Sequence, residues 1–159
     1  MAQLTVTNRE NIVINGRQQG SSRTMTFNNI VDVFTRVFSF KQQTLTTLYT
    51  THDDTVSSGV FDDGSVKYVR ITSLNAEPLV INPIGEADSS DEMNFAYELQ
   101  QGQSFYLYSH NLCMRVDDGN AISSAEMNAS LRDIDSVKAY CARGTGRVEV
   151  FVASSEASK

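Results

Sequence analysis

Apolar and polar residues alternate along several stretches of the chain, which is the pattern of strands with one face in a core. The alternation runs through residues 66–71, 94–99, 104–107 and 148–152. In the first stretch it places Val69 and Ile71 on one face and Tyr68 and Arg70 on the other. The inward positions of these strands predict a core that includes Val69, Ile71, Leu99, Phe105, Leu107 and Val150.

Turn residues separate the alternating stretches. Asp62–Ser65, Gln100–Gln103 and Gly144–Gly146 each contain a glycine, the residue that adopts a positive φ without steric cost. Each of these segments therefore predicts a chain reversal between two strands. The first two predict hairpins, and in the second of these Leu99 and Phe105 meet.

Other stretches predict further strands and one helix. Residues 30–40 could form a helix on spacing alone, but their β-branched and aromatic content favours a long strand or a bent pair, and we expect another strand over 44–51. Pro78 and Pro83 flank Leu79–Ile81, which predicts a short strand or an edge strand. Ser123 and Glu126 have capping-box spacing before good helix formers, which predicts a short helix near 125–131.

Short strands at this spacing predict an all-β fold, a two-sheet, jelly-roll-like sandwich with at most one short helix. Residues 16–23 lack an apolar anchor, so we expect a mobile loop there. The expected organisation is an extended N-terminal strand and loop over residues 1–23 that can act as an arm, a sandwich domain over 24–153, and a disordered tail over 154–159.

Composition narrows the classes of partner. The chain has 159 residues, a formal net charge of -6 and no run of Lys or Arg, which argues against binding to nucleic acid. No stretch approaches 18 apolar residues, and the first residues lack a charged segment followed by an apolar one. We therefore expect neither a nucleic-acid nor a membrane partner, and no signal peptide.

The two histidines do not form a recognisable catalytic or metal-binding pattern. His52 precedes Asp53 and Asp54 in a threonine-rich segment, and His110 stands far from it in sequence. A catalytic site needs a nucleophile, a base and oxyanion donors that converge. A β-fold metalloenzyme such as a cupin needs a cluster of histidines. We expect no enzyme activity, no catalytic residue, no metal and no cofactor.

Three glycine-containing segments look superficially like ligand loops. Residues 62–64 and 117–120 lack the alternate oxygen ligands and the bidentate Glu of a calcium loop, and turns explain both more simply. Residues 144–147 lack the phosphate-binding glycine pattern and are not followed by a predicted helix. Cys113 and Cys141 are far apart and outside any metal spacing, so we expect free thiols, while a disulfide stays open because it depends on geometry.

Two strands carry a resemblance to a known group of proteins. Residues 67–76 read KYVRITSLNA, and residues 95–105 read FAYELQQGQSF. Together they resemble small virion proteins of tailed phages, especially those of marine and cyanobacterial hosts. That group has a pattern close to YxRITNLD, followed by an aromatic strand that ends in LxPGxSF. Ser73 here replaces the usual Asn and Gln101 the usual Pro, and the resemblance covers about a quarter of the chain.

The resemblance implies a virion structural role, and we expect a decoration or cement protein on the outside of the capsid, made in the host cytoplasm. The expected partners are the major capsid protein and further copies of the chain, as a trimer. The alternatives are a tail or fibre component, or a carbohydrate- or receptor-binding module. We expect the N-terminal segment to reach the neighbouring subunit, through Leu4, Val6, Asn8, Ile12, Ile14, Arg17 and Arg23.

Overall fold

The computed structural model describes residues 2–51, 59–62, 64–85, 93–109, 111–113 and 131–157. Every regular element in these residues is a β-strand. The expected helix near 125–131 lies outside them, apart from Leu131, which begins a strand. The strands are β1 (Ala2–Arg9), β2 (Ile12–Ile14), β3 (Arg17–Gln19), β4 (Ser22–Ile30), β5 (Asp32–Lys41), β6 (Thr46–Thr50), β7 (Val66–Ser73), β8 (Leu79–Gly85), β9 (Met93–Asn94), β10 (Tyr97–Leu99), β11 (Ser104–Leu107), β12 (Asn111–Cys113), β13 (Leu131–Cys141) and β14 (Thr145–Ser154).

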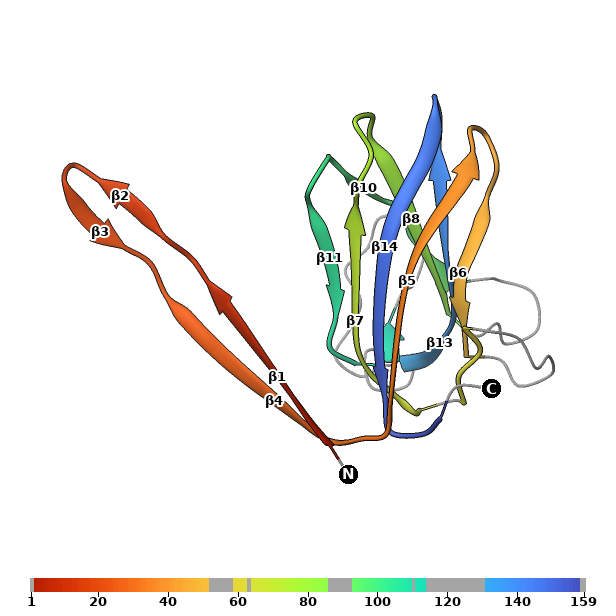
Figure 1. The fold of residues 1–159 in the computed structure, drawn as a ribbon, viewed down its shortest axis with the longest axis horizontal. Helices are drawn as coiled ribbons and strands as arrows, with labels where there is room; N and C mark the ends of the chain where they lie inside the picture. Colours follow the sequence, from red (N-terminus) through yellow and green to blue (C-terminus); the bar gives the residue numbers. More distant parts are fainter. Residues whose placement is uncertain are drawn as a thin grey trace.

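Two antiparallel sheets pack face to face, which confirms the predicted sandwich (Figure 1). The front sheet has the strand order β11-β7-β14-β5. The back sheet has the order β10-β8-β13-β12, and β6 and β9 pair with β13 and β8 respectively. No helix long and apolar enough to cross a membrane occurs in the described residues.

The core lies between the sheets and is built by the predicted alternation. Val69 and Ile71 of β7 point inward and are 1% and 0% exposed, and Val150 of β14 is fully buried beside them. Leu99 and Leu107 are also buried. Phe105 was predicted to be buried as well, but it is only partly buried. Its ring packs at the margin of the core, against Phe95 and Tyr97 at centroid distances of 5.9 and 5.7 Å.

Two of the predicted reversals connect the sheets instead of forming hairpins. Gln100–Gln103 leads from β10 in the back sheet to β11 in the front sheet, so the predicted hairpin pairing is wrong. Gly144–Gly146 likewise leads from β13 to β14 in the other sheet. The Asp62–Ser65 turn is confirmed by a hydrogen bond from Ser65 N to Asp62 O of 3.1 Å. Val60, two residues before the turn, bridges to Thr50 and not to β7, so the hairpin predicted at this turn is wrong.

Strand β8 was expected to be short or at an edge, and that prediction is wrong. It has seven residues and lies inside the back sheet, between β13 on one side and β10 and β9 on the other. Pro83 lies within it and accepts a hydrogen bond from Phe95 N of 3.4 Å. Since the N–H and C=O of a residue in an antiparallel strand point to the same side, the N–H that proline lacks would face Phe95 and not β13, so the pairing with β13 is kept.

The N-terminal segment forms one long β-hairpin, here called the arm (residues 2–30). β1 pairs with β4 and β2 pairs with β3 in a single register from Leu4↔Phe27 to Ile14↔Arg17. The mobile loop expected over 16–23 is therefore wrong. Asn15 and Gly16, with φ of 52° and 72°, form the two-residue turn that closes the hairpin.

The boundaries of the sandwich also differ from the expectation. The arm continues to Ile30, and a hydrogen bond of 2.9 Å from Val31 N to Ser154 O holds the point where it joins the body. The first sandwich strand then runs from Asp32 to Lys41, so residues 30–40 are one long strand apart from their first two positions, and Ile30 is the last residue of β4. At the other end Ser154 is a fully buried residue of β14, so the body includes the position where the tail was expected to start.

Candidate interaction site: the arm and the outer face of the front sheet

The arm is an amphipathic ribbon because its residues alternate in character. Leu4 and Val6 of β1 and Met25 and Phe27 of β4 are partly buried and share one face, since directly paired residues point to the same side. The opposite face is polar and exposed. There Gln3 bonds Asn28 at 2.9 Å and the Thr7 and Thr24 hydroxyls lie 3.1 Å apart.

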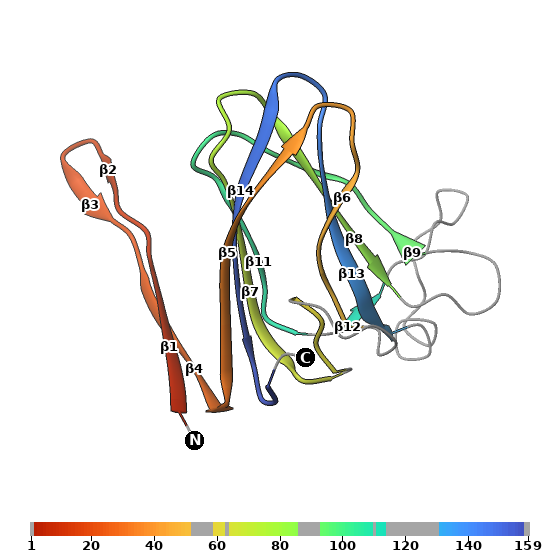
Figure 2. The same ribbon diagram turned by 45° about the vertical axis from the view of Figure 1, so that its right-hand side comes forward.

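The base of the arm lies against the outer face of the front sheet (Figure 2). Leu4, Val6 and Phe27 pack there against a buried cluster of Ile30, Tyr68 and Ala153. Phe27 lies 5.6 Å from the Tyr68 ring. This contact leaves Tyr68 only 4% exposed although it points away from the core.

The outer face of the front sheet is a regular grid of side chains. Neighbouring strands place their outward residues side by side, in rows that run from β11 through β7 and β14 to β5. The rows are Tyr68, Ala153 and Val33 nearest the base of the arm, then Tyr106, Arg70, Phe151 and Thr35, then Ser104, Thr72, Glu149 and Val37.

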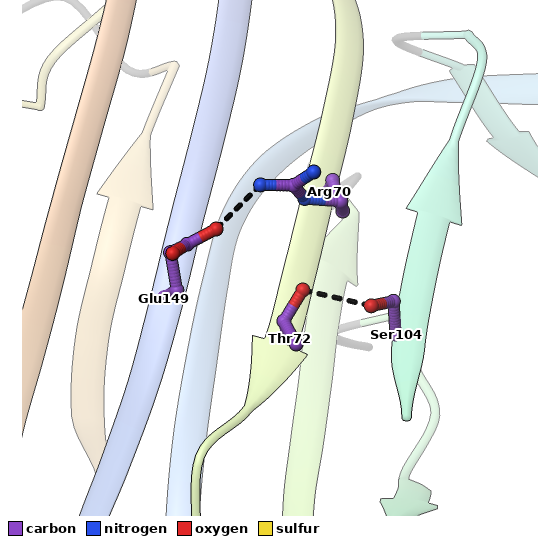
Figure 3. Close-up of polar contacts among 4 residues, drawn as sticks. All are labelled: Arg70, Thr72, Ser104 and Glu149. Atoms are coloured by element: carbon purple, nitrogen blue, oxygen red, sulfur yellow. Dashed lines mark hydrogen bonds and ion pairs between the residues drawn. The ribbon is translucent and has the colours of Figure 1, made fainter. Parts of the chain in front are cut away.

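Four polar side chains of this grid form two pairs, Arg70 with Glu149 and Thr72 with Ser104 (Figure 3). Arg70 forms an ion pair with Glu149, and its guanidinium lies 5.6 Å from the Phe151 ring centroid. The hydroxyls of Thr72 and Ser104 lie 2.7 Å apart. Both members of the ion pair keep about a third of their side-chain surface exposed, at 37% and 33%. The ion pair, the hydroxyl contact and the Phe151 ring together make a mixed polar and aromatic surface.

Tyrosines line the β11 side of the same face. The Tyr106 and Tyr108 rings are parallel at 6.1 Å, and both are roughly 40% exposed, at 39% and 41%. Asn8 of the arm donates a hydrogen bond of 3.0 Å to the Tyr108 hydroxyl. Burial raises the pKa of Tyr68, the neighbouring phenols of Tyr106 and Tyr108 raise it further, and Arg70 offsets part of the shift.

The distal half of the arm extends away from the sandwich in both views (Figures 1 and 2). At its tip Ile12, Val13 and Ile14 are 52%, 65% and 46% exposed. The strands are interrupted between the base and the tip of the arm, where the Ser21 hydroxyl donates a hydrogen bond of 2.9 Å to the Glu10 carboxylate. Gly20 is required at this interruption because a Cβ there would lie 2.2 Å from the Glu10 carbonyl oxygen.

The seven residues predicted to contact a neighbour divide between the two halves of the arm. The basal ones contact the chain's own body, through the packing of Leu4 and Val6 and the hydrogen bond of Asn8. The distal ones, Ile12, Ile14 and Arg17, are exposed, and Arg23 is also exposed but pairs with Asn8 in the basal half. The sequence reasoning missed Phe27 and Tyr68, although the alternation from Arg23 to Phe27 continues the β1 pattern and could have revealed the second strand.

Several candidate chemical groups lie outside the described residues, namely His52, His110, Asp53 and Asp54. Within the described part of the chain, His, Cys, Asp and Glu side chains do not gather in groups of three that could hold a metal ion. Cys141 is a free, buried thiol that accepts a hydrogen bond of 3.2 Å from Asn75 Nδ2. It also donates a hydrogen bond of 2.7 Å to the Arg143 carbonyl, so both hydrogen bonds of the thiol are made within the folded chain.

Comparison of the chain with protein-family models, with curated proteins and with solved structures finds no match.

Proposed function

We propose that the chain is a structural subunit of a virion, a decoration protein that binds the outside of the capsid and stabilises the shell. The observation that carries an assembly role is the arm, a long ribbon with three exposed apolar residues at its tip. An exposed apolar element that extends from a rigid body is typical of a segment that contacts another subunit. The capsid as the site of assembly rests on the sequence resemblance to phage virion proteins.

The composition of the contact surfaces fits this proposal. The outer face of the front sheet carries paired polar groups and tyrosines, which suit a wet, hydrogen-bonded interface. A small domain gains only limited affinity from a single contact with a shell. Several linked copies raise the avidity by roughly 10²–10⁴ without new types of contact. We therefore propose that the chain binds the shell as a homo-oligomer, namely a trimer.

The arm can be tested by shortening it at a paired position. Because Glu10 N donates a hydrogen bond of 2.8 Å to Ser21 O, residues 11–20 can be replaced by Asn-Gly, which preserves the base of the arm and closes the ribbon with a favoured turn. We expect this variant to keep the thermal stability of the sandwich and to bind particles at least about tenfold more weakly. Unchanged particle binding would exclude the distal arm from the interface.

The location is tested by electron cryo-microscopy of intact particles. We expect density for the sandwich on the outer surface of the head, in copies that follow the capsid symmetry. Density on the tail would replace this proposal with the tail or fibre alternative.

The carbohydrate- or receptor-binding alternative draws on exposed tyrosines, since Tyr97, Tyr106 and Tyr108 are 51%, 39% and 41% exposed. Glycan-array binding that is lost in Tyr106→Ala and retained in Tyr97→Ala would favour that function. We expect no glycan binding, because Tyr106 stacks on Tyr108, and Tyr108 in turn stacks on Phe27 of the arm.

A further inference from the structure

We propose that the distal arm of one copy packs on the outer face of the front sheet of a second copy, over Val33, Thr35 and Val37 of β5. This inference rests on the proposed assembly role and names the partner and the receiving surface of the arm.

The donor is the apolar face of the distal arm. Ile12 and Ile14 continue the face that carries Leu4 and Val6, because the pairing register does not shift between Leu4 and Ile14. A two-stranded ribbon alone is at best marginally stable in water, since it has nowhere to bury its apolar face. The basal half buries its apolar face against the sandwich of the same chain, whereas Ile12 and Ile14 stay 52% and 46% exposed.

The acceptor continues a contact that already exists within the chain. The row nearest the arm, with Tyr68 and Ala153, is covered by the apolar face of the arm base. Val33 and Val37 lie on the same outer face, one strand further along, and each is 48% exposed. Of the described strands only β14 pairs with β5, so its outer margin is open to an incoming ribbon. The outer face of β5 therefore has apolar side chains, like the neighbouring surface that the base of the arm already covers.

Charge favours a second copy as the occupant. Residues 2–30 contain three arginines and one glutamate, a formal charge of +2. The whole chain carries -6, so the remaining residues carry -8. A basic ribbon is attracted to the acidic body of another copy, and this steering is weakened by salt. Arg17 of the incoming arm lies beside Ile14, and Arg23 pairs with Asn8 nearer the base of the arm.

The donor and acceptor are different surfaces, so each copy gives an arm to the next one and receives another. Such a heterologous contact closes into a ring when the rotation allows it. A closed ring of three is the arrangement that fits the proposed trimer.

Sedimentation of the purified full chain tests the exchange. We expect Ile12→Thr/Ile14→Thr and Val33→Thr/Val37→Thr each to raise the dissociation constant of the oligomer at least about tenfold. Threonine keeps the β-branching and the strand propensity of the replaced residues while removing apolar surface. The matched control is Val13→Thr, which lies at the same tip on the opposite face and should leave the oligomer intact.

Mixing the two double variants distinguishes arm exchange from any other interface. The Val33→Thr/Val37→Thr chain keeps its arm, and the Ile12→Thr/Ile14→Thr chain keeps its acceptor surface, so together they should form a one-to-one complex. No complex on mixing, or loss of the oligomer in only one of the two variants, would overturn the inference.

The wild-type chain separates this inference from the proposed function. A monomer at concentrations up to about 100 µM, where micromolar contacts are populated, would overturn arm exchange even if the protein still binds capsids. An oligomer held by exchanged arms that binds no part of the particle would instead refute the capsid role and leave arm exchange standing.

Discussion

Replacing Phe27 with Ala should loosen the arm without unfolding the sandwich. Phe27 lies on the apolar face of the arm, with its ring 5.6 Å from Tyr68 and 6.5 Å from Tyr108. A fully buried phenylalanine removes about 150–250 Å² from water, and Phe27 is partly buried. Half of that area, at about 25 cal/mol per Å², corresponds to about 2–3 kcal/mol of docking free energy.

Hydrogen exchange of the native protein measures this loss directly. Local opening of the arm exposes the amides of Leu4–Arg9 and Ser22–Ile30 while the amides of β7 and β14 stay protected. A loss of about 2–3 kcal/mol raises the opening equilibrium about 30- to 150-fold. We expect arm amides to exchange faster by that factor in Phe27→Ala, with the denaturant midpoint of the sandwich unchanged.

The matched control is Thr26→Ala, on the exposed polar face of the same strand, which should leave the exchange rates of the arm within a fewfold of wild type. The reasoning would be refuted if Phe27→Ala accelerated exchange equally in β7 and β14. The arm and the sandwich would then unfold as one cooperative unit, and the contact with Tyr68 would belong to the core.

Three further predictions concern the body of the protein. The raised pKa of Tyr68 means that the folded state favours its neutral phenol. The contribution of the neutral phenol to the free energy of unfolding is therefore complete below pH of about 10 and is lost as the pH rises through the raised pKa. In an ultraviolet titration of tyrosinate, the ionisation at the highest pH should be missing in Tyr68→Phe. Gly146→Val should lower the free energy of unfolding by about 1–3 kcal/mol, because a Cβ there would lie 2.2 Å from the Phe40 ring, and an unchanged melting temperature would contradict this. Ile71→Ala should cost about 2–5 kcal/mol in chemical denaturation, and Phe105→Ala should cost less than full burial of its ring would imply, since it is only partly buried.

The direction of each side chain could be predicted from the sequence because it is a local property of an extended backbone. Successive residues of a strand point to opposite faces, so Val69 and Ile71 were assigned to one face and Tyr68 and Arg70 to the other without knowledge of any partner strand. Leu99, Leu107 and Val150 followed from the same rule. The all-β class and the existence of most strands were predictable for this reason.

The pairing of strands was less predictable because turn residues determine that the chain reverses and not where the next strand pairs. Gly102 has the expected positive φ of 77°, yet the strands on either side of it belong to different sheets. The choice depends on which arrangement buries the inward side chains of both strands in one core. The position of β8 inside its sheet depended likewise on partners that are distant in sequence.

The arm combines a feature that the local sequence determines with one that it does not. Its hairpin was encoded locally, since Asn15-Gly16 is a strong turn signal and the alternation resumes on the far side of it. The docking of its base was not, because Phe27 contacts Tyr68 and Tyr108 only once the sandwich has assembled the outer face that carries them. Sequence by itself determined which positions are apolar and how they alternate. Only the tertiary structure decided which of them are covered, because burial is a property of surfaces that residues far apart in the chain build together.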